Sequence, residues 1–129
     1  MNGRYLLDTN IVVALFRQEP DVQRGLAAAD EVFIPAIVLG ELYYGAGKSS
    51  RPGENTARVD EFATERSVLG CDAEVAREYG AIRNELRVKG RPLPENDLWI
   101  AAIARRHDLV LVTRDNHFRE LENLSVEAW

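Results

Sequence analysis

A short apolar run near the start of the chain limits the folds that this sequence can adopt. Residues 5–7 (Tyr-Leu-Leu) are followed at once by Asp8, Thr9 and Asn10. Short uninterrupted apolar runs are typical of strands buried on both faces of a parallel sheet, and ligands bind beyond the carboxyl ends of such strands. The pattern predicts an α/β fold with Asp8 at a candidate site. The alternative is that Asp8, Thr9 or Asn10 only caps a helix starting near Ile11, since all three types are favoured N-caps.

The same arrangement recurs near the end of the chain. Residues 109–112 (Leu-Val-Leu-Val) form a second apolar run, which stops at Thr113, Arg114, Asp115 and Asn116. Strand ends in an α/β sheet converge on one crevice, so two strands are expected to deliver carboxylates to the same edge.

Hydrophobic spacing and helix-breaking residues predict the other elements. Pro20, Gly90 and the prolines of residues 91–94 mark helix boundaries, and Asp72 and Asn96 are natural N-caps. Residues 48–53 have the composition of an exposed loop. We expect helices over 11–16, 21–29, 36–44, 55–65, 72–89 and 97–104, strands over 32–34 and 67–69, and a short helix and an edge strand in the tail.

Composition indicates a single domain over residues 1–129. The chain is 46% hydrophobic and 29% charged, and it contains no apolar run long enough to cross a bilayer. The first residues do not resemble a signal peptide, so we expect a cytoplasmic protein. Cys71 is the single cysteine and is expected to be a small, half-buried thiol. The net charge of −5 argues against a wholly basic nucleic-acid-binding surface, but carboxylates gathered around a cation would account for it.

Glu41 is the only charged residue within residues 36–44. On a helix it shares a face with Ile37 and Val38, which places a carboxylate in the apolar stripe. A buried carboxylate is costly unless it is paired or binds a metal. The alternatives are that Glu41 reaches water at the helix edge or pairs with an arginine.

Asp97 shares a helix face with Ile100, Ala101 and Ala104, the side expected to pack inward. The alternative is that it only complements the helix dipole, as acids in a first turn do.

Four carboxylates therefore stand at the ends of apolar elements or within an apolar helix: Asp8, Glu41, Asp97 and Asp115. Gathered in one pocket they would repel one another, unless hard divalent cations such as Mg²⁺ or Mn²⁺ neutralise them. Zinc fits poorly because no cluster of histidines and cysteines is present. His107 and His117 are expected to be surface or capping residues.

Four motifs in this order resemble the PIN-domain ribonucleases, especially the VapC-type toxins of prokaryotic toxin–antitoxin pairs. They are residues 5–10 (YLLDTN), Glu41 in its apolar helix, residues 93–97 (LPEND) and residues 113–118 (TRDNHF). The resemblance covers essentially the whole chain. It implies a three-layer α/β/α sandwich with a mostly parallel central sheet of four to five strands.

The resemblance also implies an activity and partners. The protein would be a Mg²⁺- or Mn²⁺-dependent endoribonuclease acting on RNA, neutralised by a VapB-like antitoxin and commonly forming a homodimer. Asp8, Glu41 and Asp97 match the core metal-binding acids, and Asp115 matches the fourth. The supporting residues would be Thr9, Asn10, Thr113 and Asn116, the last at a position where some relatives carry a further acid. Whether one metal ion or two serve is left open.

Basic residues provide candidates for holding the RNA backbone: Lys48, Arg51, Arg83, Arg87, Arg91 and Arg114. A basic helix face around residues 77–91 is the most suitable place for phosphate contacts in an acidic protein. The alternative is an ordinary solvated helix face.

Two other functions remain open at this level. Asp8 would be a phosphorylated nucleophile in a phosphatase or phosphotransfer domain, but the Asp-x-Asp pattern is broken by Asn10 and no lysine follows the late strand. A non-catalytic binding module of the same fold is the second alternative.

Overall fold

A five-stranded sheet forms the centre of the computed structural model, which describes residues 3–129. All neighbouring strands are parallel and their order is β3-β2-β1-β4-β5. The strands are β1 (Arg4–Leu7), β2 (Glu31–Pro35), β3 (Ser67–Leu69), β4 (Val110–Val112) and β5 (Val126–Glu127). The prediction of a mostly parallel sheet of four to five strands is confirmed.

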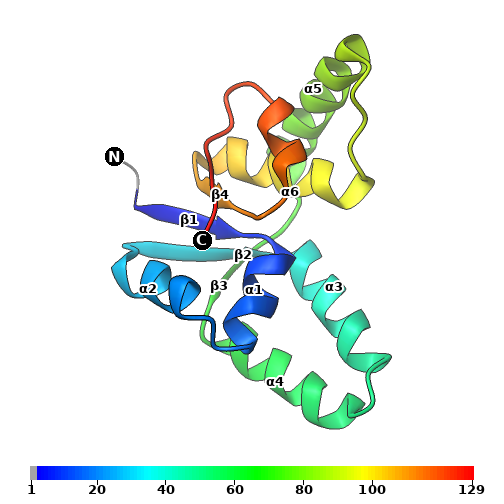
Figure 1. Ribbon diagram of the computed structural model, residues 1–129. Coiled ribbons are helices and arrows are strands. Elements are labelled where there is room, and N and C mark those ends of the chain that lie inside the picture. The colour runs from blue at the N-terminus through cyan, green and yellow to red at the C-terminus, as the bar shows by residue number, and fades with distance from the viewer. Residues whose placement is uncertain (1–2) are drawn as a thin grey trace.

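Helices cover both sides of this sheet. They are α1 (Thr9–Phe16), α2 (Pro20–Ala28), α3 (Ala36–Gly47), α4 (Pro52–Thr64), α5 (Ala73–Lys89) and α6 (Glu95–His107), with a 3₁₀ helix, η1 (Asn116–Glu120). Figure 1 shows α5 and α6 on one side of the sheet and α1, α2 and α4 on the other. This is the three-layer α/β/α sandwich expected. Within residues 3–129, none of the helices combines the length and apolarity needed to span a bilayer.

The buried centre of the sheet explains why β1 and β4 are uniformly apolar. Leu6 and Leu7 are fully buried, and they lie beside Leu111 and Val112, which are fully buried too. The parallel pairing continues one residue further, because the backbone N–H of Asp8 donates to the carbonyl oxygen of Val112 at 3.0 Å. The residues that follow the two strands therefore emerge side by side.

The ends of α5 confirm the capping pattern predicted from the sequence. The Asp72 side chain accepts a hydrogen bond from the backbone N–H of Val75 at 2.9 Å. Gly90 ends the helix in the left-handed conformation, with φ of 66°, which glycine adopts without strain. Val75, Ile82 and Leu86 are buried along the predicted inward face.

The start of α6 differs from the prediction that Asn96 is its N-cap. Pro94 is the N-cap residue, with φ of −56° and ψ of 149°, and Asn96 lies exposed in the first turn. The prolines hold the backbone extended only as far as Pro94, and Glu95 is then free to turn. The first N–H groups of a helix have no intrahelical acceptor, so a proline at this point loses nothing.

The loop after α3 is shorter than expected. The helix predicted over 55–65 begins at Pro52 and ends at Thr64, so Pro52 and Gly53 belong to its first turn. Proline is favoured at the first helical position because its ring presets φ and its missing N–H is not needed there.

Cys71 was expected to be half-buried, and this is wrong, because it is exposed. It follows β3, the outermost strand on one side of the sheet, and precedes the N-cap of α5. A connection at the sheet edge has no second layer to cover it.

Gly25 and Gly80 are expected to respond oppositely to alanine. A Cβ at Gly25 would lie 2.5 Å from Cδ2 of Trp129, whereas one at Gly80 meets nothing within 4 Å. Overpacking costs about 1–3 kcal/mol, more than the roughly 0.5–1 kcal/mol that alanine gains over glycine in a helix. Urea unfolding should therefore give a lower free energy of unfolding for Gly25→Ala and a higher one for Gly80→Ala. Equal changes would show that the Trp129 ring gives way freely.

Candidate metal centre

Asp8 lies at the carboxyl end of β1 with only 4% of its surface exposed. Its Oδ1 accepts from the backbone N–H of Thr9 at 2.8 Å, and its Oδ2 accepts from the hydroxyl of Thr113 at 2.7 Å. Asp8 is thus the N-cap of α1, which begins at Thr9 rather than near Ile11. The capping interpretation is confirmed, and it leaves the second carboxylate oxygen facing the end of β4, so the site interpretation stays a prediction.

Burial raises the pKa of the Asp8 carboxyl, because desolvation disfavours its charged form. The hydrogen bonds from Thr113 and Thr9 oppose this effect, whereas the negative charges of Asp97 and Asp115 add to it. Because the pKa of Asp8 is raised overall, its hydrogen bonds do not fully offset the cost of burying its negative charge. A cation bound at Asp8 would offset the remainder.

Glu41 reaches the same region from α3. It is half-buried, and its Oε1 accepts from the hydroxyl of Thr9 at 2.7 Å. Val38 and Leu42 on the same helix are buried, but Tyr44 is 71% exposed. Glu41 therefore lies at the margin of the buried face of α3, not within the apolar stripe as the sequence indicated.

Asp97 comes from the first turn of α6 and is half-buried. As predicted, it shares its side of the helix with Ile100, Ala101 and Ala104, which are all buried. Desolvation is the largest cause of its raised pKa, and the charges of Asp115 and Glu41 add to it. A hydrogen bond with His117 acts in the opposite direction.

His117 was expected to be a surface or capping residue, and the structure adds that this partly exposed side chain lies against one of the four acids. Its Nε2 lies 2.8 Å from Oδ2 of Asp97. One ligand atom each from Asp97, Asp115 and His117 lies within 4.8 Å of the others. The sequence carried one signal for this contact, a histidine two residues after Asp115, the acid that follows the apolar run of β4.

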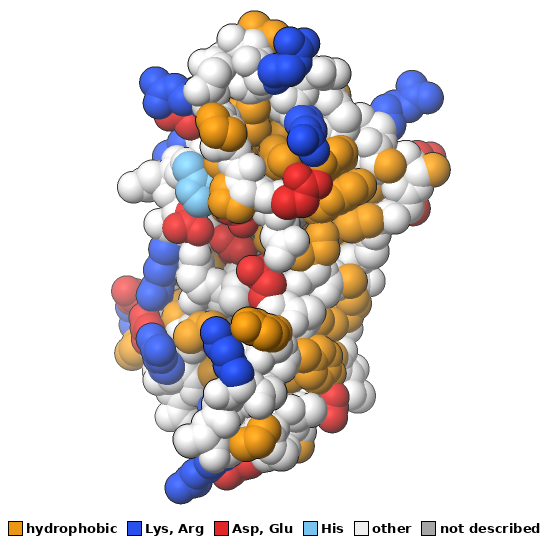
Figure 2. Space-filling model, turned by 90° about the vertical axis from the view of Figure 1, so that its right-hand side faces the viewer, with side chains coloured by type: hydrophobic (Ala, Val, Ile, Leu, Met, Phe, Trp, Pro, Cys, Tyr) orange, Lys and Arg blue, Asp and Glu red, His pale blue; other side chains and the backbone are white. Residues whose placement is uncertain are grey.

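The four predicted acids line one surface pocket of about 410 Å³, together with Thr9 and Asn10: Asp8, Glu41, Asp97 and Asp115. Figure 2 shows acidic side chains gathered near the middle of this face, with a histidine and basic side chains beside them. The structure thus brings together residues separated by up to about a hundred positions in the chain.

Thr113 holds several of these groups in place. It is 2% exposed, donates to Asp8, and accepts from the backbone N–H of Asp115 at 3.1 Å and from Nδ2 of Asn10 at 3.4 Å. Asn10 in turn accepts from the backbone N–H of Arg114 at 3.2 Å. Asn116, the other predicted supporting residue, is exposed at the start of η1 and does not line the pocket.

Thr113→Val is expected to destabilise the protein by about 1–3 kcal/mol, because it leaves buried polar groups without a partner. It should also weaken divalent-cation binding by roughly 10–100-fold, as loss of an outer-shell partner does. Thr64→Val is the matched control, since Thr64 is exposed and bonds only within α4; its effect should stay within about 0.5 kcal/mol. Calorimetric titration with Mn²⁺ and urea unfolding measure the two effects. Unchanged cation affinity in Thr113→Val would contradict the positioning role.

The candidate RNA-contact residues fall into separate groups. Arg114 lines the acidic pocket, where it pairs with Glu19 at 2.8 Å and donates from Nε to the carbonyl oxygen of Trp129 at 3.1 Å. The Lys48 ammonium lies 4.8 Å from the ring centroid of Tyr44, and Lys48 lines an adjoining pocket with Glu41. Arg51 pairs with Glu54, one helical turn along the chain.

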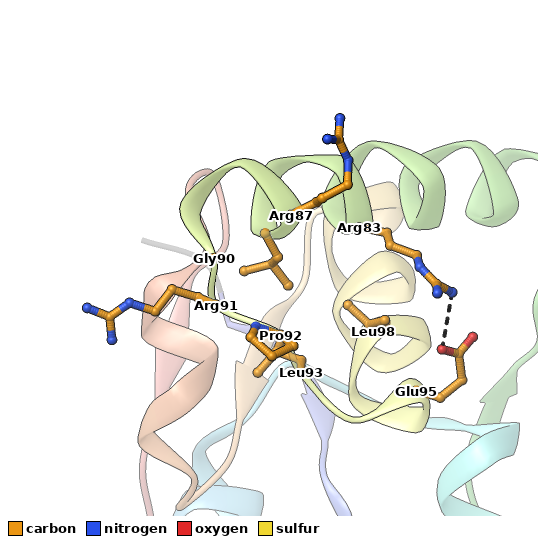
Figure 3. Close-up of a pocket in the computed structure, with 9 residues that line it drawn as sticks. Arg83, Arg87, Gly90, Arg91, Pro92, Leu93, Glu95 and Leu98 are labelled. Atoms are coloured by element: carbon orange, nitrogen blue, oxygen red, sulfur yellow. Dashed lines mark hydrogen bonds and ion pairs between the residues drawn. The ribbon is translucent and has the colours of Figure 1, made fainter.

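Three further arginines, Arg83, Arg87 and Arg91, line a different pocket of about 390 Å³ at the end of α5. Leu86, Leu93 and Leu98 contribute apolar walls (Figure 3). Arg83 pairs with Glu95 at 3.5 Å, and the side chains of Arg87 and Arg91 extend outward. None of the residues lining this pocket lines the acidic one, so the structure separates these arginines from the acids.

The donor set of the acidic pocket fits a hard divalent cation. Carboxylate and hydroxyl oxygens are the donors that Mg²⁺ and Mn²⁺ prefer. A bound cation would offset the desolvation and the repulsion between carboxylates that raise the pKa values of Asp8 and Asp97.

A parallel α/β/α sandwich with clustered acids at the carboxyl edge of its sheet bears out the resemblance found in the motifs. A family model, the PIN domain, matches residues 5–124. The chain belongs to the PIN-domain family.

Similar proteins cover the chain almost completely. Ribonuclease VapC2 of Haemophilus influenzae is 37% identical over 131 residues, and the tRNA(fMet)-specific endonuclease VapC of Shigella flexneri is 35% identical over 129 residues; in both cases 98% of each chain is covered. The solved structure of VapBC2 from Rickettsia felis bound to a fragment of its promoter DNA superposes with a TM-score of 0.89 at 34% identity, covering 97% of this chain and 98% of the other.

Proposed function

We propose that this protein is a Mg²⁺- or Mn²⁺-dependent endoribonuclease and the toxin of a VapBC-type toxin–antitoxin pair. The observation that carries the proposal is the convergence of Asp8, Glu41, Asp97 and Asp115 on one pocket. The PIN-domain family supports hydrolysis of RNA as the class of reaction, because relatives of this chain are named as a ribonuclease and a tRNA endonuclease.

The surroundings of three of the four acids indicate their tasks in this proposal. Asp8 and Asp97 are the central ligands, because both are partly withdrawn from water and carry a raised pKa. Thr9 fixes Glu41 and Thr113 fixes Asp8 by hydrogen bonds, so that carboxylate oxygens point into the pocket in a defined direction. With a divalent ion held there, the site would gain a water of lowered pKa and a positive charge opposite the charge that develops at the phosphodiester.

The proposed macromolecular partner is a VapB-like antitoxin, and a homodimer is the proposed assembly. The solved relative contains both proteins of such a pair by name. An apolar groove of about 480 Å³ between α1, α3 and α4 includes Phe16, Leu42 and Val59 and shares Thr9 and Glu41 with the acidic site. Copurification with the product of an adjacent small gene, followed by light scattering, tests the partner and the copy number. We expect the complex to act in the cytoplasm.

Cleavage of cellular RNA by the purified protein tests the activity. RNA should be cut with Mg²⁺ or Mn²⁺ and remain intact with EDTA, and sequencing of the new ends would name the substrate. Asp97→Asn should stop cleavage, whereas Asp21→Asn, an exposed acid in α2, should leave it unchanged. Intact RNA with both metals would favour the non-catalytic module. A covalent aspartyl-phosphate on Asp8 would favour the phosphotransfer alternative.

A further inference from the structure

The acidic site carries one nitrogen donor among its oxygens. His117 Nε2 lies 2.8 Å from Oδ2 of Asp97, and a ligand atom of Asp115 completes a cluster within 4.8 Å. Asp97 comes from the first turn of α6, whereas Asp115 and His117 come from the N-cap and the first turn of η1, so two separate elements meet at this cluster.

The local fold holds the imidazole in this place. η1 begins directly after Asp115 and turns His117 back toward α6. The imidazole packs against the ring of Phe118, with centroids 4.9 Å apart, and Phe118 is fully buried. The His117 side chain is still 38% exposed, so an ion from solvent has access to it.

We propose that His117 is a ligand of the bound cation, together with Asp97 and Asp115, and that it makes this site prefer Mn²⁺ over Mg²⁺. The inference rests on the divalent cation of the proposed function. Mg²⁺ is held almost entirely by oxygen, whereas imidazole nitrogen suits first-row transition ions. A neutral imidazole also adds a donor without adding a fifth negative charge to a site that already holds four carboxylates.

Pulsed electron paramagnetic resonance of bound Mn²⁺ tests coordination directly and needs neither RNA nor turnover. The chain has two histidines, His107 and His117, so an imidazole signal has only two possible sources. Mn²⁺ on the wild-type protein should show ¹⁴N modulation from a coordinated imidazole. His117→Gln should abolish this modulation, and His107→Gln, at the end of α6, should retain it.

Competition between Mn²⁺ and Mg²⁺, followed by calorimetry, tests the preference. His117→Gln is expected to lower the affinity for Mn²⁺ at least about 10-fold, the lower end of what loss of a supporting partner costs. The affinity for Mg²⁺ should change less, so the ratio of the two affinities falls. His107→Gln should leave this ratio at the wild-type value. Far-UV circular dichroism and urea unfolding verify that each variant is folded.

The outcomes separate this inference from the proposed function. If Mn²⁺ binds the wild-type protein without ¹⁴N modulation, His117 is not a ligand. The same conclusion follows if the modulation survives in His117→Gln. Neither outcome affects the proposed cleavage of RNA. If the modulation depends on His117 but the protein cuts no RNA, His117 is a metal ligand and the proposed ribonuclease activity is wrong. A wild-type protein that binds no Mn²⁺ overturns the inference outright, whereas Mg²⁺-dependent RNA cleavage would still support the ribonuclease.

Discussion

Asp8→Asn is expected to reduce RNA cleavage by more than the roughly 10–100-fold that loss of an outer-shell partner costs. Asparagine keeps one oxygen but loses the negative charge that holds the cation. Asp8 is also the most deeply buried of the four acids, and the charges of Asp97 and Asp115 lie near it. Initial rates on a defined RNA at saturating Mg²⁺ measure the loss.

The same substitution is expected to raise the free energy of unfolding of the metal-free protein at neutral pH. Asparagine is as good an N-cap as aspartate, so the hydrogen bond from Thr9 is kept while a buried charge is removed. Asp72→Asn is the matched control, because Asp72 is an exposed N-cap that bonds Val75. The control should leave cleavage and stability unchanged. A less stable Asp8→Asn protein would show that the buried charge is already compensated in the metal-free protein. Cleavage of RNA at the wild-type rate would rule out Asp8 as a metal ligand.

Addition of Mg²⁺ or Mn²⁺ is expected to give the second large effect, a gain in stability at neutral pH. A ligand that binds only the folded state stabilises it by about 2.7 kcal/mol at a concentration 100 times its Kd. The cation would also offset the desolvation, and the charges of neighbouring acids, that raise the pKa of Asp8 and Asp97. Urea unfolding with and without the ion measures the gain, which should vanish in Asp8→Asn. An equal gain in that variant would place the stabilising ion elsewhere.

In the absence of metal, the carboxyl groups of Asp8 and Asp97 should oppose folding as the pH rises. Their pKa values are raised above 3.8 in the folded protein, so the folded state binds protons more tightly than the unfolded state. Their contribution to stability is therefore present below 3.8 and is lost as the pH rises through the folded pKa values. Glu19 acts in the opposite direction, because its hydrogen bond with Arg114 lowers its pKa.

The difference in unfolding free energy between the wild type and an Asp8→Asn, Asp97→Asn double variant isolates this effect. The double variant should gain stability relative to the wild type as the pH rises from 4 to 7 in EDTA. A difference that does not change with pH would show that the two carboxyl groups ionise as freely as in the unfolded chain.

Local structure was largely predictable because its causes are local. The apolar runs of β1 and β4 must be buried wherever the chain places them, and the acids that follow them must stand at strand ends. Asp72 and Gly90 cap α5 through contacts within a few residues. The predicted start of α6 was wrong because two candidate N-caps lie close together. Pro94, the last of the extended prolines, is the N-cap in place of Asn96.

The sequence by itself determined the parallel α/β fold, the four acids and, through the order of their motifs, the family. Only the tertiary structure decided that Asp8 caps α1 while lining the acidic pocket, that Cys71 is exposed, and that His117 lies against Asp97. The physical reason is distance along the chain. Hydrophobic periodicity and capping act over a few residues. The His117 imidazole and the Asp97 carboxylate meet because α6 and η1 lie at the same end of the sheet, and this arrangement cannot be predicted from a local sequence pattern.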